Sequence, residues 1–200
     1  MEKFIVIDGF DGSGKDTQSQ FVFEMYKNIA SKNSEISSEK VVLRSHPEND
    51  NYFGCKSHKA LLKRGKTSKI IATIFFGLDV IRSLILYYHK SDVLIFSRYL
   101  LTPTYFPKKL VKPVYGFFSF ILPISDFMFY LNLPPEIAME RITRRNVDES
   151  QKLQTFENLE SLKECREKVS LIISDWIEID GSKDKNEIRK EIENILLKNN

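Results

Sequence analysis

The chain has almost no net charge, few cysteines and no long hydrophobic run. Thirty lysine and arginine residues against 27 aspartate and glutamate residues leave a formal net charge of +3 over 200 residues. Proteins that bind duplex nucleic acid usually concentrate basic residues on one face, so this balance argues against nucleic acid as a partner. The two cysteines, Cys55 and Cys165, lie far apart and outside any CxxC or Cys/His spacing, which supports neither a disulfide framework nor a zinc site. We therefore expect a cytoplasmic protein.

The sequence also lacks an evident membrane-spanning or secretory segment. The longest nearly uncharged run, residues 113–124, is about half the roughly 20 apolar residues that a spanning helix needs, and prolines bound it. The first apolar run, residues 4–7, is short and bounded by polar residues, unlike a secretory signal. We expect no membrane partner.

What is present is enough apolar sequence for one packed domain. Hydrophobic residues make up 42% of the chain and charged residues 28%, and no repeat or Pro/Gly/Ser-rich linker divides it. Because single cores extend to about 250 residues, we predict one domain over residues 1–200.

Strands and helices alternate along this domain. Short apolar runs rich in β-branched and aromatic residues predict strands at residues 4–7, 41–43, 93–96, 127–133 and 176–179. Helical spacing of apolar residues predicts helices at residues 16–30, 56–64, 68–89, 135–145, 157–174 and 185–197. Such alternation, with strands that are apolar on both faces, predicts an α/β fold with a parallel sheet.

Residues 102–123 combine a lysine cluster with aromatic residues. The members are Lys108, Lys109, Lys112, Tyr115, Phe117, Phe118 and Phe120. A surface turn followed by a core helix is one interpretation, and a partner-binding patch is the other. We favour the core helix, because apolar helix faces are usually packed.

A glycine-rich segment lies between the first expected strand and the first expected helix, and it matches G-x-x-x-x-G-K. Glycines let the backbone wrap closely around a phosphate, successive N–H groups point at it, and an exposed loop lysine, Lys15, adds a positive charge. The alternative is a chance glycine-rich turn. We favour the phosphate loop, because the expected strand before it, the spacing of the motif and the expected helix after it all agree. We expect the phosphates of a nucleotide to be bound by Gly9, Phe10, Asp11, Gly12, Ser13, Gly14, Lys15, Asp16 and Thr17.

Asp16 departs from this motif, which has a Ser or Thr ligand for Mg²⁺ after the lysine. A carboxylate in the first turn of a helix interacts favourably with the helix dipole, which is one explanation. The same carboxylate would also lie beside nucleotide phosphates, where its charge is unfavourable. A bound Mg²⁺, which prefers hard oxygen ligands, removes that objection.

With these motifs the chain resembles the thymidylate kinases, a family of nucleoside-monophosphate kinases. The resemblance covers residues 4–18, 75–79, 97–99, 130–145, 156–157 and 165–167. It implies a P-loop kinase with a five-stranded parallel sheet, flanking helices and a small lid at about residues 144–156. It also implies transfer of the γ-phosphoryl group of ATP to a deoxypyrimidine monophosphate, dTMP above all, with Mg²⁺ and usually as a homodimer.

The resemblance assigns the cations that phosphoryl transfer needs for positioning and charge neutralisation. Lys15 belongs to the phosphate loop, and Arg98 matches the arginine that grips the phosphate of the acceptor. Residues 10–13 contain no arginine, so the catalytic arginine should come from the lid. The candidates are Arg141, Arg144 and Arg145, for each of which a solvated helix face is an equal alternative.

The resemblance also implies an acceptor pocket. Asp11 matches a carboxylate that binds the 3′-hydroxyl of the sugar, and Phe76 matches the ring that stacks on the base. Tyr99, Thr102 and Phe106 match residues lining the same pocket, although a packed core residue is the alternative for each aromatic side chain.

Two positions put the base of the acceptor in doubt. The arginine that reads the thymine edge in the family falls on Val80, and Arg82 points elsewhere on a helix. A second phosphate-binding arginine has only Arg44 as a displaced match. A kinase for another nucleotide or a nucleoside is therefore an alternative.

The last departure is Ser97, where the family places an aspartate that helps to hold Mg²⁺. Because the third strand should lie beside the first, we expect Ser97 and Asp16 to face one metal ion as a reciprocal exchange of hydroxyl and carboxylate. A nucleotide-binding regulator without turnover is the remaining alternative. The chain keeps both Lys15 and Arg98, which a regulator would not need, and this favours the enzyme.

Overall fold

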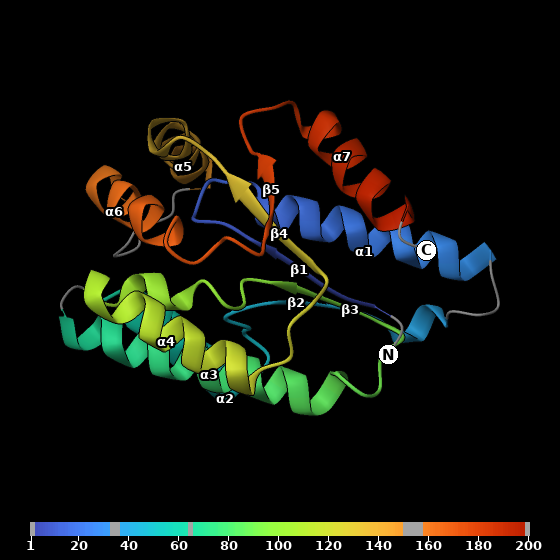
Figure 1. Ribbon diagram of the computed structural model, residues 1–200, viewed down its shortest axis with the longest axis horizontal. Coiled ribbons are helices and arrows are strands. Elements are labelled where there is room, and N and C mark those ends of the chain that lie inside the picture. Colours follow the sequence, from blue (N-terminus) through green and yellow to red (C-terminus); the bar gives the residue numbers. More distant parts are fainter. Residues whose placement is uncertain (1–2, 33–36, 64–65, 150–157, 199–200) are drawn as a thin grey trace.

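A parallel sheet lies between two layers of helices in the computed structural model, which describes residues 3–32, 37–63, 66–149 and 158–198 (Figure 1). The strand order is β2-β3-β1-β4-β5, and every neighbouring pair is parallel. This confirms the predicted α/β fold with a five-stranded parallel sheet. The strands are β1 (Lys3–Asp8), β2 (Val41–Ser45), β3 (Val93–Ser97), β4 (Phe127–Asn132) and β5 (Ile177–Asp180).

The helices begin and end close to the predicted positions, with three differences. They are α1 (Lys15–Lys32), α2 (Tyr52–Leu61), α3 (Lys66–Tyr87), α4 (Lys108–Ile121), α5 (Pro135–Glu149), α6 (Leu159–Val169) and α7 (Lys185–Lys198). α2 begins earlier than predicted because the side chain of Asn51 accepts hydrogen bonds from the N–H groups of Phe53 and Gly54, both at 3.0 Å. α6 is shorter than predicted. α5 continues past Arg145, so the predicted lid begins inside this helix, and its residues 150–156 lie outside the described residues.

Both faces of the sheet are buried, which explains why its strands are continuously apolar. Ile5 and Ile7 of β1 join a core cluster with Val22 of α1 and Ile192 of α7. The alternating residues of the same strand, such as Val6, pack on the other face with residues of α3, α4 and the segment after α6. The carboxyl ends of the strands therefore open between the two layers, where parallel α/β sheets bind ligands.

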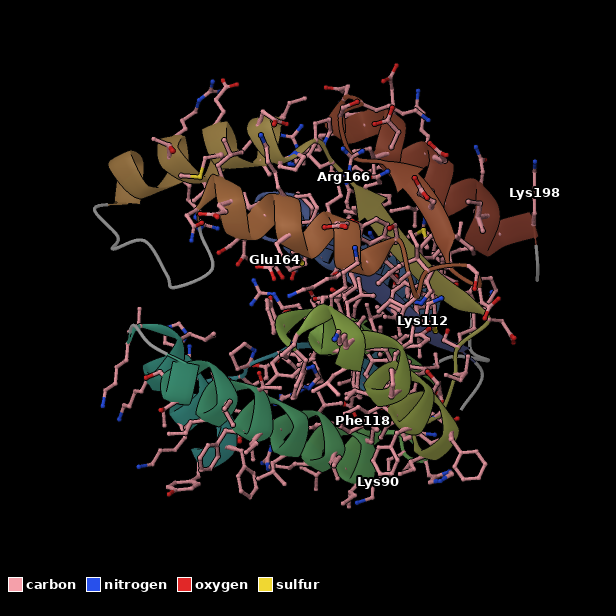
Figure 2. The ribbon with its side chains drawn as sticks, turned by 60° about the vertical axis from the view of Figure 1, so that its left-hand side comes forward. Lys90, Lys112, Phe118, Glu164, Arg166 and Lys198 are labelled. Atoms are coloured by element: carbon pink, nitrogen blue, oxygen red, sulfur yellow. The ribbon has the colours of Figure 1, made fainter. Side chains whose placement is uncertain are left out.

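α4 does not form the core helix that the sequence pattern favoured, and this interpretation was wrong. Val111 is its only fully buried residue. Phe118, labelled in Figure 2 between α4 and α3, is partly buried against the core. Phe117 and Phe120 are 61% and 91% exposed. The aromatic residues thus occupy two faces of the helix, and only one face packs.

α3 combines an inner core face with an exposed apolar outer face. Its segment Ile70–Tyr87 is long and apolar enough for a membrane span by length and composition, a property that the sequence analysis did not assign to it, and 33% of that segment is buried. On the inner face Asp79 is fully buried and accepts hydrogen bonds from the backbone N–H of Glu48 at 2.8 Å and from Asn51 at 2.7 Å. These polar contacts tie α3 to the segment after β2, as in the inner helix of a globular fold.

Candidate active site

The phosphate loop follows β1 and depends on glycine at two left-handed positions. Gly12 and Gly14 have φ angles of +83° and +89°, which side chains rarely tolerate. A Cβ atom on Gly12 would also lie 2.6 Å from the carbonyl oxygen of Ala138 in α5. The loop can therefore pack against α5 only with glycine at this position. α1 begins at Lys15, so its N-terminus and the backbone N–H groups of the loop are arranged for binding a phosphate.

Asp8, the last residue of β1, connects the phosphate loop to the segment after β3. One carboxylate oxygen accepts the N–H of Gly9 and the other accepts the N–H of Tyr99, each at 2.8 Å. Burial raises the pKa of Asp8, although the two backbone hydrogen bonds partly offset that effect. Sequence analysis missed this residue, although its position before Gly9 at the end of a strand was an available signal.

Arg98 follows β3 in a strained backbone conformation, with a φ angle of +67°. Its N–H donates to the carbonyl oxygen of Ile7 at 3.3 Å. Its guanidinium donates to Asp11 Oδ1 at 2.5 Å and to the carbonyl oxygen of His46 at 3.4 Å. Two contacts, with the phosphate loop and with the residue after β2, thus hold the guanidinium in place, as expected for a group that positions a phosphate.

Lys15 shares the same carboxylate. Its Nζ lies 3.1 Å from Asp11 Oδ1 and 3.4 Å from the carbonyl oxygen of Phe10. The side chain is 2% exposed, so the expectation of an exposed loop lysine was wrong. Burial by itself raises the pKa of Asp11, but the positive charges of Arg98 and Lys15 outweigh it and hold the pKa well below its usual range. Asp11 is therefore an ionised bridge between the two cations.

Asp16 and Ser97 lie side by side, as the sequence analysis expected. Ser97 Oγ donates a hydrogen bond of 2.6 Å to Asp16 Oδ1. The register of the sheet explains the contact, because Ser97 ends β3 opposite Ile7 of β1, just before the phosphate loop. Burial raises the pKa of Asp16, yet Lys15, Arg98 and the hydrogen bond from Ser97 together lower it. An ionised carboxylate beside a hydroxyl is the kind of oxygen donor set that Mg²⁺ prefers.

The three candidate lid arginines on α5 have different surroundings. Arg141 donates to the carbonyl oxygens of Gly181 at 3.2 Å and Gly12 at 3.5 Å, which ties the phosphate loop to the end of β5. Arg144 is 74% exposed and pairs with Glu140 at 2.9 Å. Arg145 lies close enough to Asp11 for its charge to lower the pKa of that carboxyl. Arg141 therefore reaches the phosphate loop by a hydrogen bond, and Arg145 acts on Asp11 by its charge.

A pocket opens between the phosphate loop, α2, α3 and the segment after β3. Among the expected acceptor residues, Asp11, Phe76, Arg98 and Thr102 line it, together with Gly9 and Phe10. Cys165, from the segment 165–167 that resembles the family, also lines it. Sequence analysis missed further lining residues, which carry no motif of their own: Ser57, Thr73, Thr104 and Tyr105.

Three expected acceptor residues lie elsewhere. Tyr99 and Phe106 line a separate apolar cavity between α3 and α4. The hydroxyl of Tyr99 donates to the carbonyl oxygen of Pro123 at 2.9 Å, so this side chain supports the fold. Arg44 pairs with Asp50 at 2.9 Å and does not line the pocket.

Comparisons with known proteins agree with this geometry over nearly the whole chain. The family model for thymidylate kinase matches residues 7–192. A thymidylate kinase from Leptospira interrogans serogroup Icterohaemorrhagiae serovar copenhageni is 29% identical over 204 residues, which cover 98% of this chain and 94% of that protein. Probable thymidylate kinase 1 from Saccharolobus solfataricus is 26% identical over 209 residues, covering 100% of this chain and 99% of that protein.

A solved structure shows the same fold. Thymidylate kinase from Candida albicans has a TM-score of 0.73 and 16% identity to this chain, over 98% of this chain and 92% of that one. The family match extends from the end of β1 to the middle of α7 and so includes the phosphate loop, Arg98 and α5. With its loop, sheet order and cations arranged in this way, the chain belongs to the thymidylate kinase family of nucleoside-monophosphate kinases.

Proposed function

We propose that this protein transfers the γ-phosphoryl group of ATP to dTMP, giving dTDP and ADP. The convergence of Lys15 and Arg98 on Asp11 is the observation that carries this proposal. It places one cation from the donor loop and one from the acceptor pocket at the same point. The names of the full-length relatives, all of them thymidylate kinases, support dTMP as the acceptor.

Each charged residue of the site has its own role in the proposed reaction. Arg98 holds the phosphate of the acceptor, and Asp11 is placed to accept a hydrogen bond from the sugar 3′-hydroxyl. A phosphate oxygen of the acceptor attacks the γ-phosphorus, the bond to the β,γ-bridging oxygen breaks, and ADP leaves with that electron pair. Lys15 and Arg145 stabilise the negative charge on the transferred group.

Donor binding changes the ion pairs at the site. In the structure Lys15 is paired with Asp11 at 3.1 Å. The β- and γ-phosphates of ATP carry more negative charge than one carboxylate, so Lys15 turns toward them when ATP binds. Asp11 then remains paired with Arg98 and becomes available to the acceptor sugar. Binding of the donor thus prepares the acceptor side of the pocket.

Mg²⁺ fits the pair formed by Asp16 and Ser97. Asp16 is 59% exposed at its side chain and ionised, and one of its oxygens already accepts from Ser97. Asp16 and Ser97 would hold Mg²⁺, which when bound would neutralise negative charge on the phosphates of ATP. The family has a hydroxyl after the lysine and a carboxylate before the arginine, and this chain has the same two groups in the opposite positions, at Asp16 and Ser97. Because both ligand groups are kept, we favour an active enzyme over a regulator that has lost turnover.

We also propose a cytoplasmic homodimer without a nucleic-acid or membrane partner. The outer face of α3 exposes Ile70, Ile74 and Ile85 by 55%, 55% and 74%, and a second copy of the chain would bury this stripe. The two free cysteines fit a reducing compartment. Sedimentation velocity of the wild type and of Ile74→Glu tests the dimer, which the variant should dissociate.

The test of the proposed function is ADP release with ATP, Mg²⁺ and a panel of nucleoside monophosphates. We expect turnover with dTMP. Absence of turnover with every acceptor, while ATP still binds, would contradict the kinase and favour a regulator. Turnover with a purine or a nucleoside alone would favour the alternative acceptor classes.

A further inference from the structure

The pairing of β1 with β3 ends at the active site. Ile7 lies opposite Ser97 in the last pair of the register, and the N–H of Arg98 donates to the carbonyl oxygen of Ile7 at 3.3 Å. Arg98 then adopts a φ angle of +67°, so the chain leaves the direction of the strand. A residue with a side chain keeps such a left-handed conformation only where the surrounding contacts determine it. The contacts on either side of Arg98 therefore decide where its side chain points.

Asp8 supplies the contact that follows Arg98. Its Oδ2 accepts the N–H of Tyr99 at 2.8 Å, and its Oδ1 accepts the N–H of Gly9, also at 2.8 Å. Asp8 is 4% exposed, so both hydrogen bonds are shielded from water. Arg98 is thus held by β1 on both sides, through the carbonyl oxygen of Ile7 before it and the carboxylate of Asp8 after it.

Tyr99 makes this contact rigid, because its own side chain is fixed. Its hydroxyl donates to the carbonyl oxygen of Pro123 at 2.9 Å. Its ring packs edge-to-face against the rings of Phe4 and Phe96, with centroids 5.4 and 5.5 Å away. The hydrogen bond to Asp8 therefore joins β1 to a residue that cannot easily move, and Arg98 lies between the two.

The guanidinium of Arg98 depends on this backbone when the acceptor binds. Asp11 Oδ1 and the carbonyl oxygen of His46 hold it at 2.5 and 3.4 Å. In the proposed reaction the acceptor brings a phosphate to the guanidinium and a sugar hydroxyl to Asp11, so both partners of this ion pair gain a competitor. The backbone then remains the fixed reference for the direction of the side chain.

We propose that Asp8 is a positioning residue of the acceptor site. It holds the backbone of Arg98 in the left-handed conformation and thereby aims the guanidinium at the phosphate of the acceptor. This inference rests on the proposed function, which assigns that phosphate to Arg98, and extends it to a residue that acts through Arg98.

Asp8→Asn tests the need for two acceptor oxygens. Asparagine has the same size but one acceptor oxygen, and its amide group would face the second N–H, donor against donor. Gly9 is adjacent in the chain and keeps the remaining oxygen, so the N–H of Tyr99 loses its acceptor. The affinity for dTMP should fall by about tenfold to a hundredfold, as for a misplacement of about 1 Å, while the affinity for ADP stays within about threefold. Calorimetry measures both, and equal losses for dTMP and ADP overturn the inference.

Arg98→Met distinguishes action through Arg98 from a direct contact with the acceptor. Methionine keeps a long side chain without the cation, so this variant by itself binds dTMP more weakly. Adding Asp8→Asn should then change the affinity for dTMP by less than about twofold, because no guanidinium remains to be positioned. If Asp8→Asn costs the same factor with and without Arg98, Asp8 acts on the acceptor or on the fold independently, and the inference fails.

Asp92→Asn is the matched control. Asp92 precedes β3 at the opposite end of the strand, and its carboxylate also accepts a backbone N–H, that of Ser37 at 3.1 Å. The variant alters the same kind of contact away from the site, so its affinities for dTMP and ADP should stay within about twofold of wild type. A loss of dTMP affinity as large as that of Asp8→Asn would show a general effect of the fold and would overturn the inference.

Urea unfolding shows whether each variant is folded during the titrations. If Asp8→Asn does not fold, Asp8→Glu and Asp8→Gln repeat the comparison with a longer side chain. Glutamate keeps two acceptor oxygens, so Asp8→Glu should bind dTMP at least about fivefold more tightly than Asp8→Gln. Equal affinities of these two variants overturn the inference.

The proposed function and this inference fail in different ways. Turnover of dTMP by the wild type, with equal losses of affinity from Asp8→Asn in both backgrounds, leaves the kinase intact and overturns the inference. If the wild type binds dTMP but transfers no phosphoryl group, the kinase proposal fails, and the binding measurements still decide the inference. A loss in Asp8→Asn that disappears in the Arg98→Met background supports it in either case.

Discussion

Ser97 Oγ donates a hydrogen bond of 2.6 Å to Asp16 Oδ1, across the junction of β3 and the phosphate loop. The hydroxyl comes from the acceptor side of the site and the carboxylate from the donor side. Parallel pairing of β1 and β3 brings them together, because Ser97 lies opposite Ile7. The site thus contains an oxygen pair for Mg²⁺ although neither residue matches the motif at its own position.

Exchanging these two residues tests the pair as a unit. Asp16→Ser and Ser97→Asp should each lower the Mg²⁺ affinity of the ADP complex by about tenfold to a hundredfold, because either change alters the donor set. The double variant should recover much of that loss. The measurement is binding of Mn²⁺, as a spectroscopic substitute, to the ADP complex, alongside Mg²⁺-dependent turnover. A double variant no better than either single change would contradict the reciprocal exchange.

Gly12→Ala should impair both stability and nucleotide binding. The alanine would have to adopt a φ angle of +83°, and its Cβ would lie 2.6 Å from the carbonyl oxygen of Ala138. We therefore expect a loss of about 1–3 kcal/mol in the free energy of unfolding. Gly116→Ala in α4 is the control, because nothing lies within 4 Å of its Cβ, and it should stabilise the helix by about 0.5–1 kcal/mol. Urea unfolding and ADP calorimetry measure both effects, and equal stabilities of the two variants would refute the packing argument.

The neighbouring arginines of α5 should differ sharply in catalysis. Arg145→Met should reduce kcat by about a thousandfold, since a cation on the transferred phosphate is lost. Arg144→Met should remain within about twofold of wild type, because Arg144 is exposed and paired with Glu140. Steady-state turnover at saturating ATP and dTMP measures both. The reverse order would assign the catalytic role to Arg144.

His46 should make the fold sensitive to mild acid. Burial, followed by the nearby charge of Arg44, lowers the pKa of His46 to about 3, and its Nε2 lies 2.9 Å from Ser83 Oγ. The unfolded chain takes up a proton near pH 6.5, whereas the folded chain does not, so the free energy of unfolding should fall as pH decreases from 6.5 toward 3. The slope from this residue approaches about 1.4 kcal/mol per pH unit.

His46→Gln should flatten that dependence, and urea unfolding at a series of pH values measures the slope. His89→Gln, at an exposed position, is the matched control and should leave the slope unchanged. Identical slopes in wild type and His46→Gln would show that His46 does not control acid stability.

The sequence predicted the architecture well because local patterns determine much of it. The phosphate loop, the alternation of strands and helices and the position of Arg98 all depend on residues close together in the chain. The pairing of Asp16 with Ser97 followed from the expected order of two strands. Each of these predictions rests on short-range pattern or on sheet topology.

The exposure of single side chains and the walls of the pocket depend on packing that the sequence pattern does not encode. Phe117 and Phe120 have the spacing of a core helix and yet are exposed, because α4 packs through its other face. Lys15 is buried because Asp11 and the loop carbonyl enclose its amine. The pocket walls from α2 and α3 carry no motif, so Ser57 and Thr73 became visible only in three dimensions.

The carboxylate of Asp11 joins the cation of the donor loop, Lys15, to the cation of the acceptor pocket, Arg98. The most direct measurement is chromatographic detection of dTDP from ATP, Mg²⁺ and dTMP, with wild type and with Lys15→Met, which keeps a long apolar stem in the buried position. We predict dTDP formation by the wild type and loss of at least about a thousandfold in the variant, with ADP binding weakened and the fold retained. Undiminished dTDP formation by Lys15→Met, or none by the wild type, would contradict the account.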